Sequence, residues 1–235
     1  MFGDEQMKIY YIGLSKMNEK IHFIFMGKPS AGKGTSGQLI AKLHDLVEVS
    51  TGEALREIAQ SGTPLGEKVE KIISTGNLVD DELITEILKQ KLDSINKGII
   101  LDGYPRDITQ AKTLENFFKV DYVIYFDAED DVVINRITGR RTCPKCGKIY
   151  HIVTIKPKVD GICDVCGSIL KTREDDTEEV MIKRLANYRE KTEPVIDFYK
   201  QKGLLKVFNA NPAFPDLKDD LINFFDELIN KVREK

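Results

Sequence analysis

The sequence predicts an α/β fold, a parallel five-stranded sheet with flanking helices. Short apolar runs alternate along the chain with longer segments in which apolar residues recur at helical spacing. This alternation is typical of a parallel sheet covered on both faces, because a helix-length crossover must connect neighbouring parallel strands. A glycine-rich loop follows the first strand, and one cysteine-rich segment, 141–173, interrupts the alternation. We interpret that segment as a small inserted domain.

The strands are expected where the chain is most apolar, at 21–26, 46–49, 98–102, 121–126 and 204–208. Their carboxyl ends are marked by polar or glycine residues: Gly27, Ser50 with Thr51, Asp102, Asp127 and Asn209. Ligands of parallel α/β sheets bind outside this edge of the sheet. These residues therefore predict where the functional site lies.

Helices are expected between the strands. The first follows the loop and contains Leu39, Ile40 and Leu43, and the others are expected at 53–61, 65–74, 80–92, 131–139, 176–202 and 216–232. The segment 50–52 and Asp80 suit helix N-caps. Asp176, with Glu179 three residues later, resembles a capping box for the long helix.

Composition narrows the class of protein. Hydrophobic residues make up 41% and charged residues 31% of 235 residues, which is typical of soluble globular proteins. The net charge of −3 argues against a general nucleic-acid binder, and no apolar stretch approaches the ~18 residues of a membrane span. Residues 1–20 lack a secretory signal, and we expect a flexible extension there unless Met7 or Met17 is the true first residue. A cytoplasmic protein without nucleic-acid or membrane partners is expected.

The loop 27–35 is the most informative segment. It matches the pattern GxxxxGK at Gly27, Gly32 and Lys33, although Gly34 separates the lysine from Thr35. Glycines allow backbone N–H groups to surround a phosphate, and the lysine would reach the β- and γ-phosphates as a point charge. The loop therefore favours a fold of the P-loop NTPase type that binds a nucleoside triphosphate.

Two other interpretations of the loop stay open. Gly32, Gly34 and Gly37 also match the dinucleotide fingerprint GxGxxG, and Glu53 follows at about the distance of a ribose contact. An NAD-dependent enzyme is thus a distant alternative, although GxGxxG alone is a weak signal and leaves Lys33 unexplained. The second open interpretation is an ordinary glycine turn that connects a strand to a helix.

Further motifs follow in a characteristic order. They are the GKGT ending of the loop, Ser50-Thr51-Gly52-Glu53 with Arg56, Asp102-Gly103-Tyr104-Pro105-Arg106 with Gln110, Gly139-Arg140-Arg141, and Arg173-Glu174-Asp175-Asp176. Together, from about Ile21 to the C-terminus, they resemble the adenylate kinase family in its long-lid, zinc-binding form. The resemblance implies reversible phosphoryl transfer from ATP to AMP with magnesium, giving two ADP.

The resemblance also implies an organisation of the chain. Residues 21–49, 80–138 and 177–235 would form the core domain, 50–79 an AMP-binding arm, and 139–176 a zinc-binding lid, after the extension at 1–20. Members of the family are usually monomers, so we expect one here.

Site residues are carried over from the family motifs as expectations. The catalytic group would be Lys33, Arg106, Arg140, Arg173, Arg184 and, mainly through water on magnesium, Asp102. ATP would contact Ser30, Ala31, Gly32, Lys33, Gly34, Thr35, Arg136, Arg140, Ile149, Tyr150 and Asn211. AMP would contact Thr51, Arg56, Asn77, Leu78, Val79, Gly103, Tyr104, Pro105, Arg106, Gln110, Arg173 and Arg184. Asp175 and Asp176 would orient arginines of the lid.

Three residues bear on specificity and on a departure from the family. Thr51 and Gln110 stand where the family reads the adenine of AMP, whereas relatives that phosphorylate pyrimidine nucleotides usually carry Ala in place of this Thr. Ser30 replaces a glycine that is common at this loop position. If the position requires a positive φ, serine costs about 1 kcal/mol or more.

Four cysteines form the pattern Cys143-x₂-Cys146-x₁₆-Cys163-x₂-Cys166. Two C-x-x-C-G knuckles at this spacing predict a zinc site, and four thiolates leave no open position, so the metal would be structural. Disulfides are a rival interpretation, disfavoured in a chain without export signals. A nucleic-acid-binding zinc ribbon is another. The three histidines form no metal or triad pattern.

Two other functions remain open from the sequence. A GTP-using AMP kinase of the same family would have the same acceptor site, and a non-catalytic ATP-binding zinc-ribbon adaptor would bind ATP without turnover. The set of arginines argues against the adaptor.

Overall fold

A five-stranded parallel sheet forms the centre of the molecule. The computed structural model describes residues 20–234, so the extension expected at 1–20 lies outside the described residues except for Lys20. The strand order is β2 (Val47–Ser50), β3 (Ile99–Asp102), β1 (His22–Gly27), β4 (Tyr122–Asp127) and β7 (Leu205–Asn209). All neighbours are parallel, which confirms the predicted fold class and the five predicted strands.

Strand β1 shows why the sheet is covered on both faces. Its side chains alternate between two buried cores, with Phe23 and Phe25 in one and Ile24 and Met26 in the other. Period-two alternation with apolar residues on both sides is expected of a central parallel strand. The helices that cover the sheet must therefore present apolar stripes to both faces.

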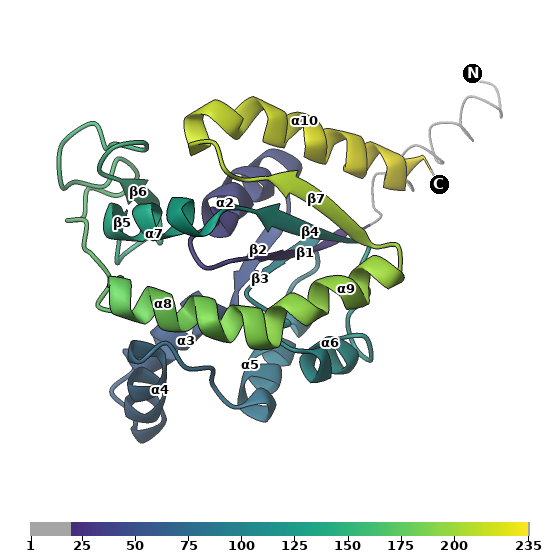
Figure 1. The fold of residues 1–235 in the computed structure, drawn as a ribbon, viewed down its shortest axis with the longest axis horizontal. Helices are drawn as coiled ribbons and strands as arrows, with labels where there is room; N and C mark the ends of the chain where they lie inside the picture. The colour runs from purple at the N-terminus through teal and green to yellow at the C-terminus, as the bar shows by residue number, and fades with distance from the viewer. Residues whose placement is uncertain (1–19, 235) are drawn as a thin grey trace, which may run out of the picture.

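The helices do so from both sides of the sheet. Their bounds are α2 (Lys33–His44), α3 (Thr51–Ala59), α4 (Pro64–Ser74), α5 (Asp81–Asp93), α6 (Ile108–Leu114), α7 (Asp130–Thr138), α8 (Glu178–Asn187), α9 (Glu193–Gln201) and α10 (Phe214–Arg233). Figure 1 shows α10 and α2 above the sheet, and α5, α6, α8 and α9 below it. Helix α10 buries Leu221 and Phe225 in the first core, and α9 buries Val195 and Tyr199 in the second.

The register of the sheet brings the predicted site residues to one edge. Ser50 pairs with Asp102, and Phe25 of β1 pairs with Asp102 from the other side. Asp127 pairs with Asn209. The carboxyl ends of the strands and the loop after Gly27 consequently open at the same edge, as the sequence predicts.

The long helix expected at 176–202 is present, with details that the sequence analysis missed. It is one continuous helical segment in which a π-helical turn, Tyr188–Thr192, joins α8 to α9. Its N-cap is Thr177, whose hydroxyl accepts from the N–H of Val180, whereas Asp176 forms an ion pair with Arg140. Helix α6, capped by Asp107, was not expected, because its short apolar pattern follows a proline and an aspartate.

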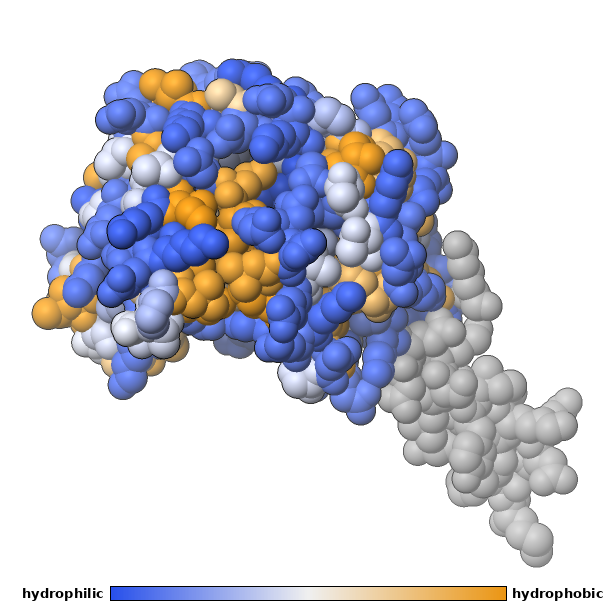
Figure 2. Space-filling model, turned by 90° about the horizontal axis from the view of Figure 1, so that it is seen from below, coloured by the Kyte–Doolittle hydropathy of each residue, from blue (hydrophilic) through white to orange (hydrophobic). Residues whose placement is uncertain are grey.

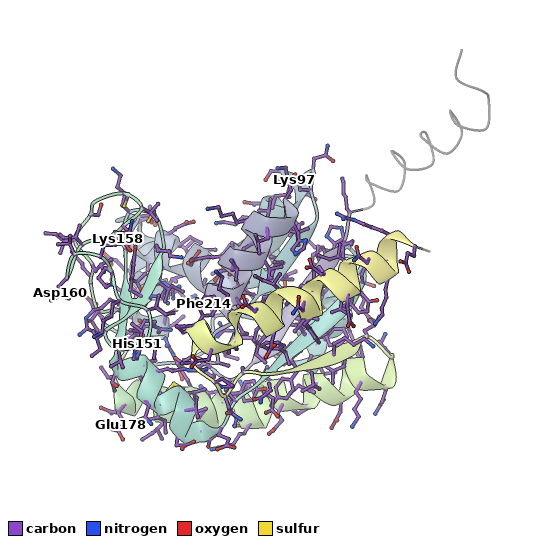
Figure 3. The ribbon with its side chains drawn as sticks, turned by 90° about the horizontal axis from the view of Figure 1, so that it is seen from above. Lys97, His151, Lys158, Asp160, Glu178 and Phe214 are labelled. Carbon is purple, nitrogen blue, oxygen red and sulfur yellow. The ribbon has the colours of Figure 1, made fainter. Side chains whose placement is uncertain are left out.

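The cysteine-rich segment forms a small unit of its own at the left of Figure 1. A two-stranded antiparallel sheet joins β5 (Arg140–Thr142) to β6 (Ile149–His151), and a bridge pairs Thr142 with Lys171. Figure 3 shows His151 on the side of this unit nearer the core, with Lys158 and Asp160 at its outer edge. We call this unit the lid.

The outer surface is mixed in character. Figure 2 shows apolar residues in the middle of the face seen from below, bordered by hydrophilic ones. Within residues 20–234, the helices include none with both the length and the apolar composition of a bilayer-spanning segment.

Candidate functional site

The glycine-rich loop begins where β1 passes close to β4. Gly27 has φ 142°, and a Cβ at this position would lie 2.6 Å from the carbonyl oxygen of Phe126. Only glycine tolerates that approach. The loop then turns back, with the ammonium group of Lys33 donating to the carbonyls of Gly27 at 2.8 Å and Lys28 at 2.9 Å. Lys33 thus points into the hollow of its own loop.

Ser30 adopts the conformation that the sequence analysis considered costly. Its φ is 62°, and within the described residues its buried Oγ atom has no hydrogen-bond partner. A non-glycine residue in this left-handed region costs roughly 1–2 kcal/mol. The loop therefore carries strain next to the position of the phosphates that the sequence predicts.

A cavity of about 300 Å³ lies outside the carboxyl edge of the sheet, bounded by the loop, the segment 50–79, the lid and α8. All of the predicted cations line it. These are Lys33, Arg56, Arg106, Arg136, Arg140, Arg173 and Arg184. They come from segments far apart in the sequence, so the fold itself assembles this cluster of positive charge.

The cations are partly buried, and several of them are close enough to repel one another. Burial lowers the pKa of Lys33, and Arg106 and Arg140 lower it further, although Asp102 opposes them. The pKa of Arg173 is lowered to about 10 by burial and then by Arg140 and Arg56. Burial likewise lowers the pKa of Arg106, with Arg184 adding to the effect. A cluster of partly buried cations of this kind favours binding of a polyanion.

Specific contacts orient these arginines. Arg106 donates from Nε to the carbonyl of Gly103 at 2.8 Å, and its own carbonyl accepts from the hydroxyl of Thr192 at 2.8 Å. Arg140 forms an ion pair with Asp176, which is fully buried.

Arg184 forms the second buried pair of the site. Its partner is Asp175. Burial would raise the pKa of Asp175, but Arg184 and Arg56 lower it below its usual value. Asp176 thus contacts an arginine of the lid, as expected, whereas Asp175 contacts Arg184 of α8 instead.

Acidic side chains face the cations. Asp102 lines the cavity at the end of β3, and within the described residues its buried Oδ1 atom has no hydrogen-bond partner. Its Oδ2 atom and Oε1 of Glu48 both lie 3.8 Å from the Cβ position of Gly34. Carboxylate oxygens are the ligands that magnesium prefers, commonly through retained water, so Asp102 fits the predicted metal contact.

Glu48 was missed by the sequence analysis. Burial, Asp102 and Glu53 raise its pKa to about 9, and its carboxyl oxygen would lie 2.4 Å from a Cβ at Gly37. Its position two residues before Ser50 on β2 was the available signal, because alternate residues of a strand share a face.

The predicted acceptor side of the cavity is only partly lined by the expected residues. Asn77, Leu78, Val79, Gly103 and Pro105 line it. Thr51, Tyr104 and Gln110 are buried but do not line it.

The polar groups of these buried residues have protein partners. Thr51 donates to the carbonyl of Asp102 at 3.3 Å, and the Tyr104 hydroxyl is 2.9 Å from that of Thr85. Gln110 accepts from the N–H of Arg106 at 2.7 Å and donates to Asp81 at 2.6 Å. Thr51 and Gln110 therefore contact the groups that shape the cavity.

The predicted adenine side of the donor contains Arg136. Its guanidinium donates to the carbonyls of Asn211 at 3.1 Å and Pro212 at 2.7 Å. Arg136 lines the cavity, whereas Asn211 does not. The Asn211 side chain accepts from the N–H of Glu129 at 2.8 Å. Figure 3 shows Phe214, another residue of the cavity wall, at the start of α10 between the lid and the core.

The four cysteines come together at the lid. Their sulfur atoms all lie within 4.8 Å of one another, with Cys143 and Cys166 3.3 Å apart and Cys146 and Cys163 3.5 Å apart. A disulfide has sulfur atoms about 2.05 Å apart, whereas tetrahedral zinc with Zn–S bonds of about 2.3 Å separates them by roughly 3.8 Å. The cluster therefore fits a metal ion rather than two disulfides.

Two matching turns build the cluster. Gly147 donates its N–H to the carbonyl of Cys143 at 3.0 Å, and Gly167 donates to Cys163 at 2.9 Å. Both glycines have positive φ, 72° and 71°. The buried hydroxyl of Tyr150 donates to the sulfur of Cys163 at 3.5 Å. Ile149 and Tyr150 both line the cavity, so β6 connects the cysteine cluster to the predicted donor site.

Comparisons with a family model and with known proteins point to the same family. The family model described as adenylate kinase matches residues 25–204. An adenylate kinase of Thermosipho africanus is 42% identical over 220 residues, covering 91% of this chain and 100% of the relative. An adenylate kinase of Treponema denticola is 46% identical, covering 81% of this chain and 92% of the relative. An adenylate kinase of Fervidobacterium nodosum is 40% identical, covering 86% of this chain and 96% of the relative.

Proposed function

Because the chain belongs to the adenylate kinase family, we propose that it catalyses reversible transfer of the terminal phosphoryl group of ATP to AMP, forming two ADP. One observation of the molecule carries the proposal. A lysine and several arginines from separate segments converge on one cavity beside the glycine-rich loop. An enzyme that moves a phosphoryl group between two nucleotides needs this concentration of positive charge.

The chemistry asks for position and charge rather than for a protein nucleophile. Phosphoryl transfer requires donor and acceptor in line and stabilisation of charge on the equatorial oxygens. We assign the donor phosphates to the loop and to Lys33, which would exchange its carbonyl partners for phosphate oxygens. Arg140 from the lid and Arg184 from α8 would stabilise the transferred group.

The acceptor is assigned to the other half of the cavity. Arg56 and Arg106 would bind the phosphate of AMP, with Arg173 beside them. Thr51 and Gln110 are proposed to select adenine. The contact of Gln110 with the backbone N–H of Arg106 supports a link between the base-reading residue and the phosphate-binding one.

We propose that the enzyme uses two metal ions with different roles. Magnesium bound with ATP would neutralise phosphate charge, and Asp102 is the residue proposed to hold it, mainly through water. One zinc ion is assigned to the four cysteines as a structural ion, because four thiolates complete its coordination.

We further propose that the enzyme acts as a monomer in the cytoplasm. A single chain supplies the whole set of cations that lines the cavity, so no second subunit is needed to complete the site. The cysteines are free thiols, and a reducing compartment keeps them available to the metal.

A nucleotide panel tests the function. Purified protein is given ATP or GTP as donor and AMP, CMP or UMP as acceptor, with magnesium, and the diphosphates are quantified. The expected result is rapid ADP formation from ATP plus AMP and little transfer to CMP or UMP. Binding of ATP without any transfer would reject the proposal and favour an adaptor, whereas faster transfer from GTP would change the donor.

A further inference from the structure

A glutamine on the phosphate-binding helix contacts the lid. Gln38 lies in the second turn of α2, the helix that begins at Lys33. Its side-chain amide donates to the carbonyl oxygen of Gly147 at 3.1 Å. The contact joins a rigid part of the core to the segment that contains the cysteines.

Gly147 is part of the first cysteine knuckle, which we define as residues 143–148. The N–H of Gly147 donates to the carbonyl of Cys143 at 3.0 Å, and the N–H of Cys143 donates to the carbonyl of Lys148 at 2.9 Å. These bonds hold the peptide units on either side of the one whose carbonyl Gln38 contacts. The direction of that carbonyl therefore depends on the shape of the knuckle.

Two neighbouring contacts bring the same part of the lid against the core. Oε1 of Glu53, on α3, is 3.4 Å from the Cβ position of Gly147. The terminal carbon of Ile149, on β6, is 3.3 Å from the Cβ position of Gly34 in the phosphate loop. The first knuckle and the strand after it thus lie against both α2 and α3, at the wall of the cavity.

We propose that Gln38 is a positioning residue that docks the first cysteine knuckle on the phosphate-binding helix and thereby couples metal occupancy of the cysteines to closure of the lid over the donor nucleotide. A metal ion on the sulfur atoms would fix the knuckle and, with it, the carbonyl of Gly147. A nucleotide that prefers the closed arrangement then binds more tightly when this contact forms. The inference rests on the proposed function only for the identity of the donor, ATP.

The first arm of the test removes the amide donor. Gln38→Met keeps the length of the side chain, and Gln38→Asn keeps the amide but is too short to reach Gly147. Calorimetry of ATP binding to the zinc-loaded chain should show affinity reduced about three- to tenfold in both variants, as loss of one hydrogen bond predicts. AMP affinity should stay unchanged. Gln90→Met is the matched control, because the amide of Gln90 contacts only Glu86 of its own helix among the bonds observed.

The second arm removes the metal. Zinc is stripped from the wild type and from Gln38→Met, with metal analysis to verify the loss, and ATP binding is measured again. Zinc removal should lower the ATP affinity of both proteins, because the lid also supplies Arg140. The difference between the wild type and Gln38→Met should disappear in the zinc-free proteins, so the two effects are not additive. Unchanged ATP affinity in both Gln38 variants would overturn the proposal, as would fully additive effects.

The readout separates this inference from the proposed function. Calorimetry reports binding and needs no turnover, so a chain that binds ATP without transferring phosphate still tests Gln38. Conversely, an active enzyme whose ATP affinity does not change when Gln38 is substituted would refute only the docking proposal.

Discussion

Lys33 illustrates how a single residue is prepared for its role. Its ammonium group donates to two carbonyls of its own loop, and burial with neighbouring arginines lowers its pKa. A phosphate in the loop would be a better partner than a neutral carbonyl, because its negative charge adds Coulomb attraction to the hydrogen bond. The residue is thus positioned before the substrate arrives.

Loss of this charge should affect the rate far more than the fold. We expect Lys33→Met and Arg106→Gln each to reduce kcat by about 10²–10³-fold, as removal of charge-stabilising groups does. Arg233→Gln, at the exposed end of α10, should leave kcat unchanged. Steady-state kinetics with ATP and AMP provide the measurement, and a change of less than about threefold for Lys33→Met would contradict the assigned role.

Glu48 should make the stability of the nucleotide-free and magnesium-free protein depend on pH. Its pKa is about 9 in the folded state against 4.5 for an ordinary glutamate, so between these values the folded state keeps a proton that the unfolded state has lost. The free energy of unfolding therefore falls as the pH rises, with a penalty of about 3 kcal/mol by pH 7. Glu48→Gln should remove this penalty.

Denaturant unfolding from pH 5 to pH 8 tests the prediction. The difference in stability between Glu48→Gln and the wild type should grow with pH, whereas exposed Glu70→Gln should show no such trend. A constant difference across the range would mean that Glu48 is ionised in the folded protein.

For single residues, the sequence predicted the chemical role of a side chain better than it predicted the neighbours that the fold places around that side chain. The roles of Gly27 and of the cysteine spacing could be predicted, because each depends on local backbone geometry. The effect of Glu48 could not, because it arises from Asp102 and Glu53, which the fold brings near from other segments. The positive φ of Ser30 could be suspected only because glycine is common at that position in the family.

At the scale of elements, the two ends of the lid are joined by a buried ion pair. Arg140 begins β5, and Asp176 precedes α8. The antiparallel bridge between Thr142 and Lys171 lies further into the lid. Since the pair closes the base of the lid, it should fix both the stability of the lid and the direction of Arg140.

Asp176→Asn should weaken both properties. Neutralising one partner of a buried pair leaves the other charge uncompensated, and because asparagine can still accept one hydrogen bond we expect a loss of about 1–3 kcal/mol. The kcat/KM for ATP should fall more than that for AMP, since Arg140 is assigned to the donor side. Thermal unfolding and kinetics should show both effects, with Glu227→Gln, an exposed helix pair with Lys231, as control. Unchanged melting temperature and kinetics would exclude this role.

The elements themselves were largely predictable. Strands were found because buried parallel strands are short, apolar and flanked by turn residues, and the five predicted segments all lie in the sheet. The π-helical turn at Tyr188–Thr192 could not be predicted, because the helical spacing of apolar residues continues through it and is shifted by only one residue. Likewise, Thr177 caps α8 because Asp176 is engaged by Arg140, a contact that no local pattern encodes.

At the scale of the whole molecule, the lid depends on something other than its own core. Its buried cluster consists of Cys143, Tyr150, Cys163 and Leu170, too few apolar side chains to stabilise an independent unit. Apolar residues of the lid are exposed instead, among them Val153 (67%), Val165 (67%) and Ile169 (68%). The proposed metal would replace the missing core.

Removal of zinc should therefore unfold the lid before the rest. Chelation is expected to release one zinc per chain, to lower the melting temperature by more than about 5 °C, and to expose 139–176 to proteases while the sheet stays protected. Cys163→Ser should behave in the same way, and Lys145→Ser, a neighbouring exposed residue, should not. Metal analysis that finds no zinc in protein prepared with zinc present would refute the assignment.

The π-helical turn also sets the phase of the long rod made by α8 and α9. One extra residue in a turn rotates everything after it by roughly 100° about the helix axis. Before the turn, the rod directs Arg184 and Asn187 to the cavity, and after it the rod directs Val195 and Tyr199 into the second core. A regular helix of the same sequence would bring these two stripes out of alignment, so Tyr188–Thr192 lets one rod serve the substrate at one end and the sheet at the other.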